Sequence, residues 1–334
     1  MNAMGWDGMG WELCWLIHVS ASYDIDPLAT LAHFTPSRPS INYKSFAKGI
    51  KTMEIPFFPT LFSTVRSLVV RQPFFPTLED WLVNHPKILG FSWNNGQTPA
   101  SSQRFLALTV LCYISFTFIL SQVSRPSLAR PVLKSISALH NLFLVTLSFI
   151  MALGCLVSIF SQVPNFRTLV CFPKRTSPSG PLFFWGYIFY LSKIVEFMDT
   201  LLIILGNSMK RLSFLHVYHH SMVVIMSYVC INSAQSSFSM VLVTNCTVHV
   251  VMYAYYLMCT LGVRPKWKKM VTDFQLVQFW SSFLIMAMLV FYHFTGSGCS
   301  GFLSWCFNAA FIVSLLFLFS DFHAKNYSPK VKNA

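Results

Sequence analysis

Charged side chains are scarce in this 334-residue chain: they make up only 10% of it, and only 11 residues are acidic. A soluble domain carries about 25% charged residues. The shortage therefore excludes an ordinary soluble protein. Together with 54% hydrophobic residues and a mean hydropathy of +0.55, it predicts an all-α, polytopic membrane protein. The longest uncharged stretch separates Arg211 from Arg264 and covers 52 residues.

Other absences narrow the function. The chain has no Cys-x-x-Cys pair, and most of its nine cysteines lie in apolar runs, where cysteine behaves as a small hydrophobic residue. It has no long basic stripe, so nucleic acid is not expected as a partner despite a net charge of +13. The basic residues lie in short segments between apolar runs, which suits anionic lipid headgroups or phosphorylated cofactors. No pattern predicts a metal site or a tightly bound cofactor.

Seven apolar segments are long enough to cross a membrane, since a hydrocarbon core about 30 Å thick requires about 20 helical residues. They are residues 105–123, 138–160, 182–205, 214–231, 238–261, 273–293 and 302–320. On one side of these spans, the loops and the tail carry twelve lysines and arginines, against three on the other side. This asymmetry predicts a cytosolic C-terminus.

The chain divides into four expected parts. Residues 1–77 are predicted to be a poorly ordered N-terminal extension, and 78–104 an interfacial, lumenal lead-in. Residues 105–323 hold the seven spans, and 324–334 form a cytosolic tail. Lys330 and Lys332 stand fifth and third from the C-terminus. That spacing resembles a dilysine signal and predicts the endoplasmic reticulum membrane as the location; the alternative is a solvated basic tail.

Four histidines lie in the uncharged stretch. His216, His219 and His220 have the spacing i, i+3, i+4 and share one helix face, while His249 shares a face with Asn245. Polar groups at membrane depth are costly and are kept where they line a cavity or do chemistry. Imidazole serves as nucleophile, base or metal ligand. The four histidines therefore predict a reactive centre inside the bundle.

The third span carries a charged stripe formed by Lys193, Glu196 and Asp199. Each charge at the centre of a bilayer costs roughly 2.5–3.5 kcal/mol on insertion scales. One interpretation is a structural ion pair between Lys193 and Glu196. The other is that Lys193 meets a phosphate or carboxylate while Glu196 or Asp199 orients a histidine.

Further polar pairs, His140 with Asn141 and Gln275 with Gln278, lie near the same ends of other spans. Together these groups predict a cavity that is polar at the cytosolic end and apolar beyond it, which suits an acyl-CoA. Basic residues around this end are candidates for its phosphates, although each also serves the charge asymmetry. They are Lys210, Arg211, Arg264, Lys266, Lys268 and Lys269.

Five motifs resemble the ELO family of fatty-acid elongases, the membrane 3-ketoacyl-CoA synthases, over roughly residues 78–330. The motifs are His140-Asn141, Lys193-x-x-Glu196-x-x-Asp199-Thr200, His216-x-x-His219-His220, Asn245-x-x-x-His249-x-x-Met252-Tyr253-x-Tyr255-Tyr256 and Thr272-x-x-Gln275-x-x-Gln278-Phe279. The resemblance implies six helices around an acyl tunnel and a seventh outside them. It also implies condensation of acyl-CoA with malonyl-CoA in the endoplasmic reticulum. Implied partners are membrane lipid, the reductases and dehydratase of the elongation cycle, and further copies of the chain.

The catalytic residues that follow are His219, His249, His216 and His220. Residues expected to bind substrate or CoA are Lys193, Glu196, Asp199, His140, Asn141, Asn245, Tyr253, Tyr256, Gln275, Gln278 and Lys266. We favour attack by His219 on the acyl thioester, with the other three histidines moving protons or stabilising an oxyanion. Direct condensation without an acyl-enzyme remains an alternative, as does Cys246 as nucleophile. Arg211 replaces a Gln that is common in members preferring polyunsaturated chains, which favours saturated or monounsaturated ones.

Cys171 and Cys299 fall in two loops on the expected lumenal side. Because the lumen is oxidising, we predict a disulfide between them.

Two rival functions were weighed. A membrane di-iron desaturase or hydroxylase also uses His-x-x-His-His, but it needs about eight histidine ligands, and this chain has no second such motif. A seven-span receptor or transporter fits the span count. It does not require histidines at membrane depth.

Overall fold

The computed structural model describes residues 57–123 and 129–327, and within these residues it is all helical. The long helices are α7 (Gln103–Gln122), α8 (Arg130–Gln162), α10 (Pro181–Val195), α12 (Phe214–Asn232), α13 (Phe238–Leu261), α14 (Lys268–Thr295) and α15 (Phe302–Tyr327). The shorter ones are α4 (Phe57–Val70), α5 (Phe75–Leu82), α6 (Pro86–Leu89), α9 (Phe166–Val170), α11 (Phe197–Leu205) and the 3₁₀ turn η2 (Met209–Arg211). The prediction of an all-α, polytopic membrane protein is confirmed.

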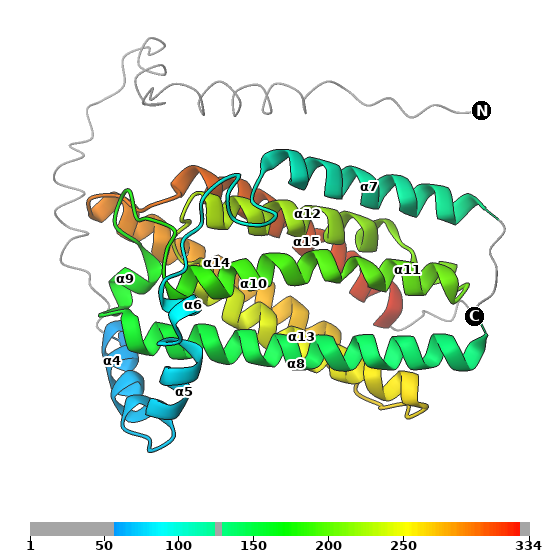
Figure 1. The fold of residues 1–334 in the computed structure, drawn as a ribbon, viewed down its shortest axis with the longest axis horizontal. Helices are drawn as coiled ribbons and strands as arrows, with labels where there is room; N and C mark the ends of the chain where they lie inside the picture. The colour runs from blue at the N-terminus through cyan, green and yellow to red at the C-terminus, as the bar shows by residue number, and fades with distance from the viewer. Residues whose placement is uncertain (1–56, 124–128, 328–334) are drawn as a thin grey trace, which may run out of the picture. The chain divides into compact units, whose positions relative to one another are not determined.

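Among the described residues, six helices are each long and apolar enough to cross a membrane: α7, α8, α12, α13, α14 and α15. The expected span 182–205 consists of two shorter helices, α10 and α11, which meet at Glu196. Glu196 keeps a right-handed helical backbone, with φ −62° and ψ −12°. The chain therefore continues in nearly the same direction, as Figure 1 shows.

Several helices are longer than the apolar segments that predicted them. Helix α8 begins at Arg130, eight residues before the expected span, and its 33 residues extend over ~50 Å at 1.5 Å per residue. Helix α14 likewise begins at Lys268 rather than at residue 273. Hydropathy detects only the part of a helix that lies in hydrocarbon, so polar turns that continue the same helix beyond it were missed.

The helices pack into one bundle whose two ends differ. Helices α4, α5, α6 and α9 gather at one end (Figure 1), where Cys171 and Cys299 also form a disulfide. We call this the disulfide end. This pairing is the one predicted from the loop positions. At the other end, called the basic end, η2 and the start of α14 supply Lys210, Arg211 and Lys268.

Close packing inside the bundle depends on one small residue. An added Cβ at Gly154 of α8 would lie 2.1 Å from the Trp185 indole of α10, so only glycine admits this ring. The indole Nε1 of Trp185 in turn donates to the Leu82 carbonyl at 3.0 Å. Small residues allow membrane helices to approach closely. Here one glycine brings α8, α10 and the end of α5 together.

Helix α4 lies within residues 1–77, expected to be a poorly ordered extension, and α5 crosses from that segment into the expected interfacial lead-in. Arg66 of α4 donates from Nε to the Phe160 carbonyl at 2.7 Å and from Nη1 to the Pro164 carbonyl at 3.3 Å. Carbonyls at the end of a helix lack intrahelical partners, and a nearby cation stabilises them. Arg66 therefore caps the end of α8. The tail with Lys330 and Lys332 and residues 1–56 lie outside the described residues.

Candidate active site

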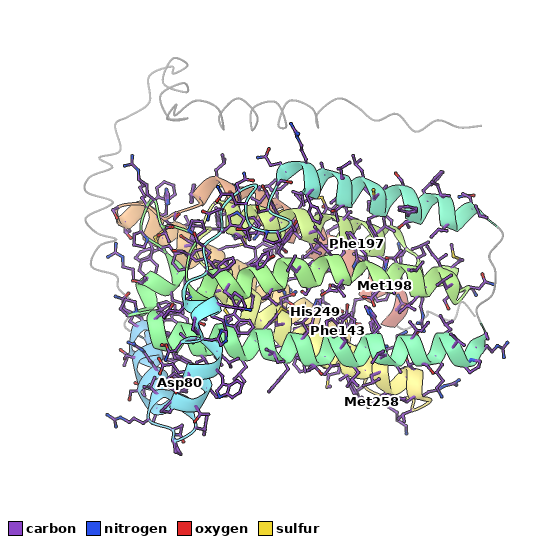
Figure 2. The ribbon with its side chains drawn as sticks, viewed as in Figure 1. Asp80, Phe143, Phe197, Met198, His249 and Met258 are labelled. Carbon is purple, nitrogen blue, oxygen red and sulfur yellow. A yellow bond between two sulfur atoms is a disulfide. The ribbon has the colours of Figure 1, made fainter. Side chains whose placement is uncertain are left out.

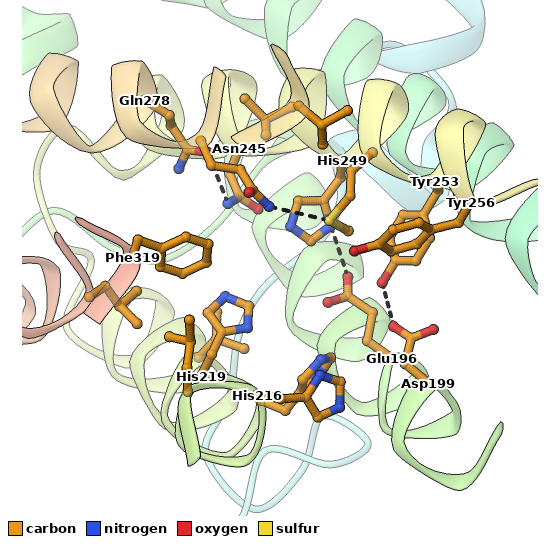
Figure 3. Close-up of a pocket in the computed structure, with 18 of the residues that line it drawn as sticks. Glu196, Asp199, His216, His219, Asn245, His249, Tyr253, Tyr256, Gln278 and Phe319 are labelled. Carbon is orange, nitrogen blue, oxygen red and sulfur yellow. Dashed lines mark hydrogen bonds and ion pairs between the residues drawn. The ribbon is translucent and has the colours of Figure 1, made fainter. Parts of the chain in front are cut away.

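A cavity of about 880 Å³ runs between α8, α10, α11, α12, α13, α14 and α15, and all four predicted histidines line it. His249 lies near the middle of the bundle's length (Figure 2), and His216 and His219 reach toward it from α12 (Figure 3). Toward the disulfide end the walls are apolar. They include Val223, Met226, Leu242, Phe279, Ile312 and Leu315. The cavity is thus polar toward the basic end and mainly apolar toward the disulfide end.

His249 lies against the buried ion pair of the third expected span. Lys193 Nζ donates to Glu196 Oε1 at 2.7 Å, and each side chain is about 1% exposed. His249 Nδ1 lies 3.4 Å from Glu196 Oε1 and 3.4 Å from Lys193 Nζ. A carboxylate beside one ring nitrogen fixes the orientation of an imidazole and leaves the other nitrogen for chemistry. Glu196 lines the cavity, whereas Lys193 lies behind it.

Asp199 forms a second cluster toward the basic end. It accepts from Tyr253 OH at 2.7 Å and lies 3.0 Å from His140 Nε2. Asn141 donates to Thr260 Oγ1 at 3.3 Å. These contacts tie α8, α11 and α13 together around the polar part of the cavity. Asp199, Asn141 and Tyr253 line the wall, and His140 supports it from behind.

His216 is held by a chain of hydroxyl groups. Its Nε2 lies 2.9 Å from Thr200 Oγ1, and Tyr113 OH of α7 lies 3.0 Å from the same oxygen. Tyr113 was not predicted as a site residue from the sequence. The only available signal was a tyrosine inside an apolar span, which is too common to identify a site. Helix α7 thereby reaches His216, although it does not line the cavity.

His219 and His220 differ from the other two histidines. Within the described residues no hydrogen bond or ion pair holds either ring. His220 is 6% exposed, packs 4.3 Å from the His216 ring and keeps a buried, unpartnered Nδ1. His219 is partly exposed to the cavity and lies edge-on to His220, with ring centres 5.3 Å apart. Among the four histidines, His219 is therefore the one that is partly exposed and that no described residue holds by a hydrogen bond.

Amide side chains form the wall opposite α12. Asn245 Nδ2 lies 3.5 Å from Gln278 Oε1, while Asn245 Oδ1 is buried without a partner (Figure 3). Gln275 makes only a weak contact, from Nε2 to Met252 Sδ at 3.5 Å. Buried polar atoms without good partners are costly. This wall is thus suited to receive polar atoms of a substrate.

The basic end supplies three cations to the cavity, namely Lys210, Arg211 and Lys268, together with Tyr256. Lys266, the basic residue assigned to CoA binding from the sequence, does not line it. Lys268 is the first residue of α14, whereas Lys266 lies in the turn before that helix. Because the two lysines are two residues apart, the Lys268 side chain reaches the cavity and the Lys266 side chain does not.

Cys246 also lies outside the cavity wall. It is 1% exposed and belongs to the apolar core formed with Val224 and Leu242. Although Cys246 stands only three residues before His249, its thiol is not directed at the space that the histidines line. Among the described residues, no group of three or more His, Cys, Asp or Glu side chains is arranged to hold a metal ion.

The sequence pattern of one family spans most of this chain. The GNS1/SUR4 family (ELO) matches residues 98–334. The chain belongs to this family. Fatty acid elongase A of Dictyostelium discoideum is 33% identical over 252 residues, covering 72% of this chain and 89% of that protein. Fatty acid elongase 3-like of Arabidopsis thaliana is 28% identical over 267 residues, covering 75% and 91%. Mouse very long chain fatty acid elongase 5 is 32% identical over 206 residues, covering 59% and 66%. The ELO match includes all five motifs and leaves out α4, α5 and α6.

Proposed function

We propose that this chain is the condensing enzyme of fatty-acid elongation, which joins acyl-CoA to malonyl-CoA and releases 3-oxoacyl-CoA, CoA and CO₂. The observation that carries the proposal is the cavity itself. Four histidines stand where a basic, polar end meets an apolar interior. An acyl thioester placed along it has its phosphates among cations, its reactive carbon among imidazoles and its chain in hydrocarbon-like surroundings. The names of the related proteins support the same activity.

In the first step, a nitrogen of His219 attacks the thioester carbon. A carbon–nitrogen bond forms, the carbon–sulfur bond breaks, and CoA leaves as a thiolate that takes up the proton lost from the His219 ring. His219 suits this role because no other group occupies its ring nitrogens. An imidazole that is already held, as His249 and His216 are, is better placed to move protons or stabilise charge.

In the second step, malonyl-CoA replaces CoA. Loss of CO₂ leaves the electron pair of the broken carbon–carbon bond on the malonyl carbon. This carbon attacks the acyl group, and the carbon–nitrogen bond to His219 breaks. The amide N–H groups of Asn245 and Gln278 are suited to donate to the carbonyl oxygens through both steps. Direct condensation is the competing route, in which His219 acts only as a base. The two routes share products and differ in whether an acyl-enzyme accumulates.

Lys268 is expected to bind the phosphates of CoA, and Lys266 offers a matched control. Replacing Lys268 by glutamine should raise KM for both CoA substrates about threefold to fivefold, the size of one exposed ionic contact. It should leave kcat nearly unchanged, because the contact exists in ground and transition states alike. Lys266→Gln removes the same charge two residues away and should change KM less than twofold. Equal effects of both variants would contradict this assignment.

We further propose that the protein resides in the endoplasmic reticulum membrane with a cytosolic C-terminus. The charge asymmetry of the loops and the Lys330 and Lys332 spacing support this. A disulfide between Cys171 and Cys299 at the end opposite the cations suits an oxidising lumen. The partners of the protein would be the reductases and dehydratase that complete each elongation cycle, and other copies of this chain.

The proposed function is tested with purified protein in detergent or vesicles, supplied with malonyl-CoA and acyl-CoAs of increasing length. We expect 3-oxoacyl-CoA, with one CO₂ and one CoA released per product, detected by mass spectrometry. Saturated and monounsaturated chains should react faster than polyunsaturated ones, because Arg211 stands where members that prefer polyunsaturated chains commonly have Gln. Failure to form the product with any chain, by protein that remains folded, would overturn the proposal.

A further inference from the structure

Two polar side chains interrupt the apolar part of the cavity at its far end. Cys230 of α12 and Asn308 of α15 line it there, although apolar residues surround both. Asn308 Nδ2 reaches only the Cys230 sulfur, at 3.7 Å, and the sulfur donates to Gln235 Oε1 at 3.2 Å. Sulfur is a weak acceptor. Within the described residues, the Asn308 carbonyl oxygen accepts no hydrogen bond. We call Cys230, Gln235 and Asn308 the polar floor.

The polar floor is remote from the reacting centre. Cys230 follows His219 by eleven residues on α12, and Asn308 precedes Phe319, the aromatic neighbour of His219, by eleven residues on α15. A helical rise of about 1.5 Å per residue makes both separations ~17 Å. The separations along α12 and α15 both place these polar groups near the tip of a bound acyl chain, far from its thioester.

A second cavity of about 10 Å³ adjoins the polar floor and shares Asn308 with the main one. Gln235 and Trp305 line it, and Trp305 Nε1 is buried there without a hydrogen-bond partner. A space of roughly 10–15 Å³ holds one water-sized group when polar partners surround it. The side chains of Gln235, Trp305 and Asn308 therefore line a space for about one water-sized group beside the end of the tunnel.

We propose that the polar floor binds a hydroxyl group at the ω-end of the acyl chain, so that the enzyme elongates ω-hydroxyacyl-CoAs. The hydroxyl accepts from Trp305 Nε1 and donates to the Asn308 carbonyl oxygen. A methyl end would leave the buried Trp305 Nε1 unpaired, which is unfavourable. An ω-carboxylate fits less well, because no lysine or arginine is among the described residues lining this end. This inference rests on the proposed function and specifies its substrate class.

The test compares ω-hydroxyacyl-CoAs with methyl-ended acyl-CoAs of the same lengths, using the full chain and malonyl-CoA. At the length that reaches the polar floor, kcat/KM should be about tenfold higher for the hydroxylated chain, the effect of two net hydrogen bonds. Asn308→Leu, which keeps the volume and removes the amide, should reverse this preference. Trp305→Phe should reduce it. Cys306→Ala, on the exposed side of α15, is the matched control and should leave the ratio unchanged.

Two outcomes overturn the inference: a wild-type ratio at or below one at every length, or a ratio that Asn308→Leu and Trp305→Phe both leave intact. In either case, turnover of methyl-ended chains would show that the proposed function survives. If no substrate is elongated, thermal unfolding in the presence of each acyl-CoA tests binding at the polar floor instead. The hydroxylated acyl-CoA should raise Tm more than the methyl-ended one in wild type but not in Asn308→Leu, and equal shifts would refute the polar floor.

Discussion

Protein lacking the His219 imidazole is expected to retain its fold and lose nearly all turnover. His219→Ala should reduce kcat by a factor on the order of 10⁴ or more, as removal of a nucleophile does in other covalent enzymes. The decisive measurement is intact mass after incubation with acyl-CoA alone. Wild type should gain the mass of one acyl group, and the variant should gain none. Because malonyl-CoA is withheld, the acyl-enzyme cannot discharge by condensation.

The control for this experiment is His85→Asn. His85 is exposed and caps α6 by accepting from Lys87 N, a role that asparagine can take over. It should form the adduct like wild type. An adduct that persists in His219→Ala would reassign the nucleophile to its neighbour His220. Product formation by wild type without any adduct would favour direct condensation, with His219 as a base.

The second large effect is expected at the buried ion pair. Glu196→Gln leaves the Lys193 ammonium in the core without its carboxylate, and Lys193→Met leaves the carboxylate without its cation. Each single substitution should lower the free energy of unfolding by about 3–5 kcal/mol, the cost of an uncompensated buried charge. The double variant, Lys193→Met with Glu196→Gln, should regain most of that stability. It should remain inactive, because His249 has lost the carboxylate beside Nδ1.

An exposed ion pair with the same N–O distance provides the comparison. Lys325 Nζ lies 2.7 Å from Asp321 Oδ2, but the two side chains are 73% and 47% exposed. Lys325→Met should change the free energy of unfolding by no more than about 1 kcal/mol. Thermal unfolding in one detergent would measure all four variants. If the double variant recovered activity along with stability, Glu196 would be a structural partner of Lys193 only.

Helical spacing was enough to predict which histidines share a face. His216, His219 and His220 fall within two turns of one helix, so their proximity depends on the local geometry of α12 alone. The disulfide was likewise predictable, since loop positions and topology brought Cys171 and Cys299 to one side. Contacts between helices were not predictable in this way. The hydroxyl chain from Tyr113 to His216 depends on how α7, α11 and α12 pack, which no periodicity encodes.

The difference between Lys266 and Lys268 illustrates the same limit at smaller scale. Both lie in one basic cluster, and composition cannot separate them. The start of α14 separates them, and that boundary fell within polar sequence where hydropathy gives no signal. The polar floor was missed for a related reason. Cys230 and Asn308 are each ordinary within an apolar span, and only the packing of α12 against α15 makes them neighbours.

The contacts of the N-terminal helices also bear on the order of folding. Arg66 caps a helix end 94 residues further along, Leu82 accepts from an indole 103 residues ahead, and Trp93 Nε1 donates to Asn232 across 139 residues. During synthesis these segments leave the ribosome before any of their partners exist. Long-range contacts of this kind close late. Helices α4 and α5 are therefore made before the bundle helices that they contact, but they are secured only after those helices.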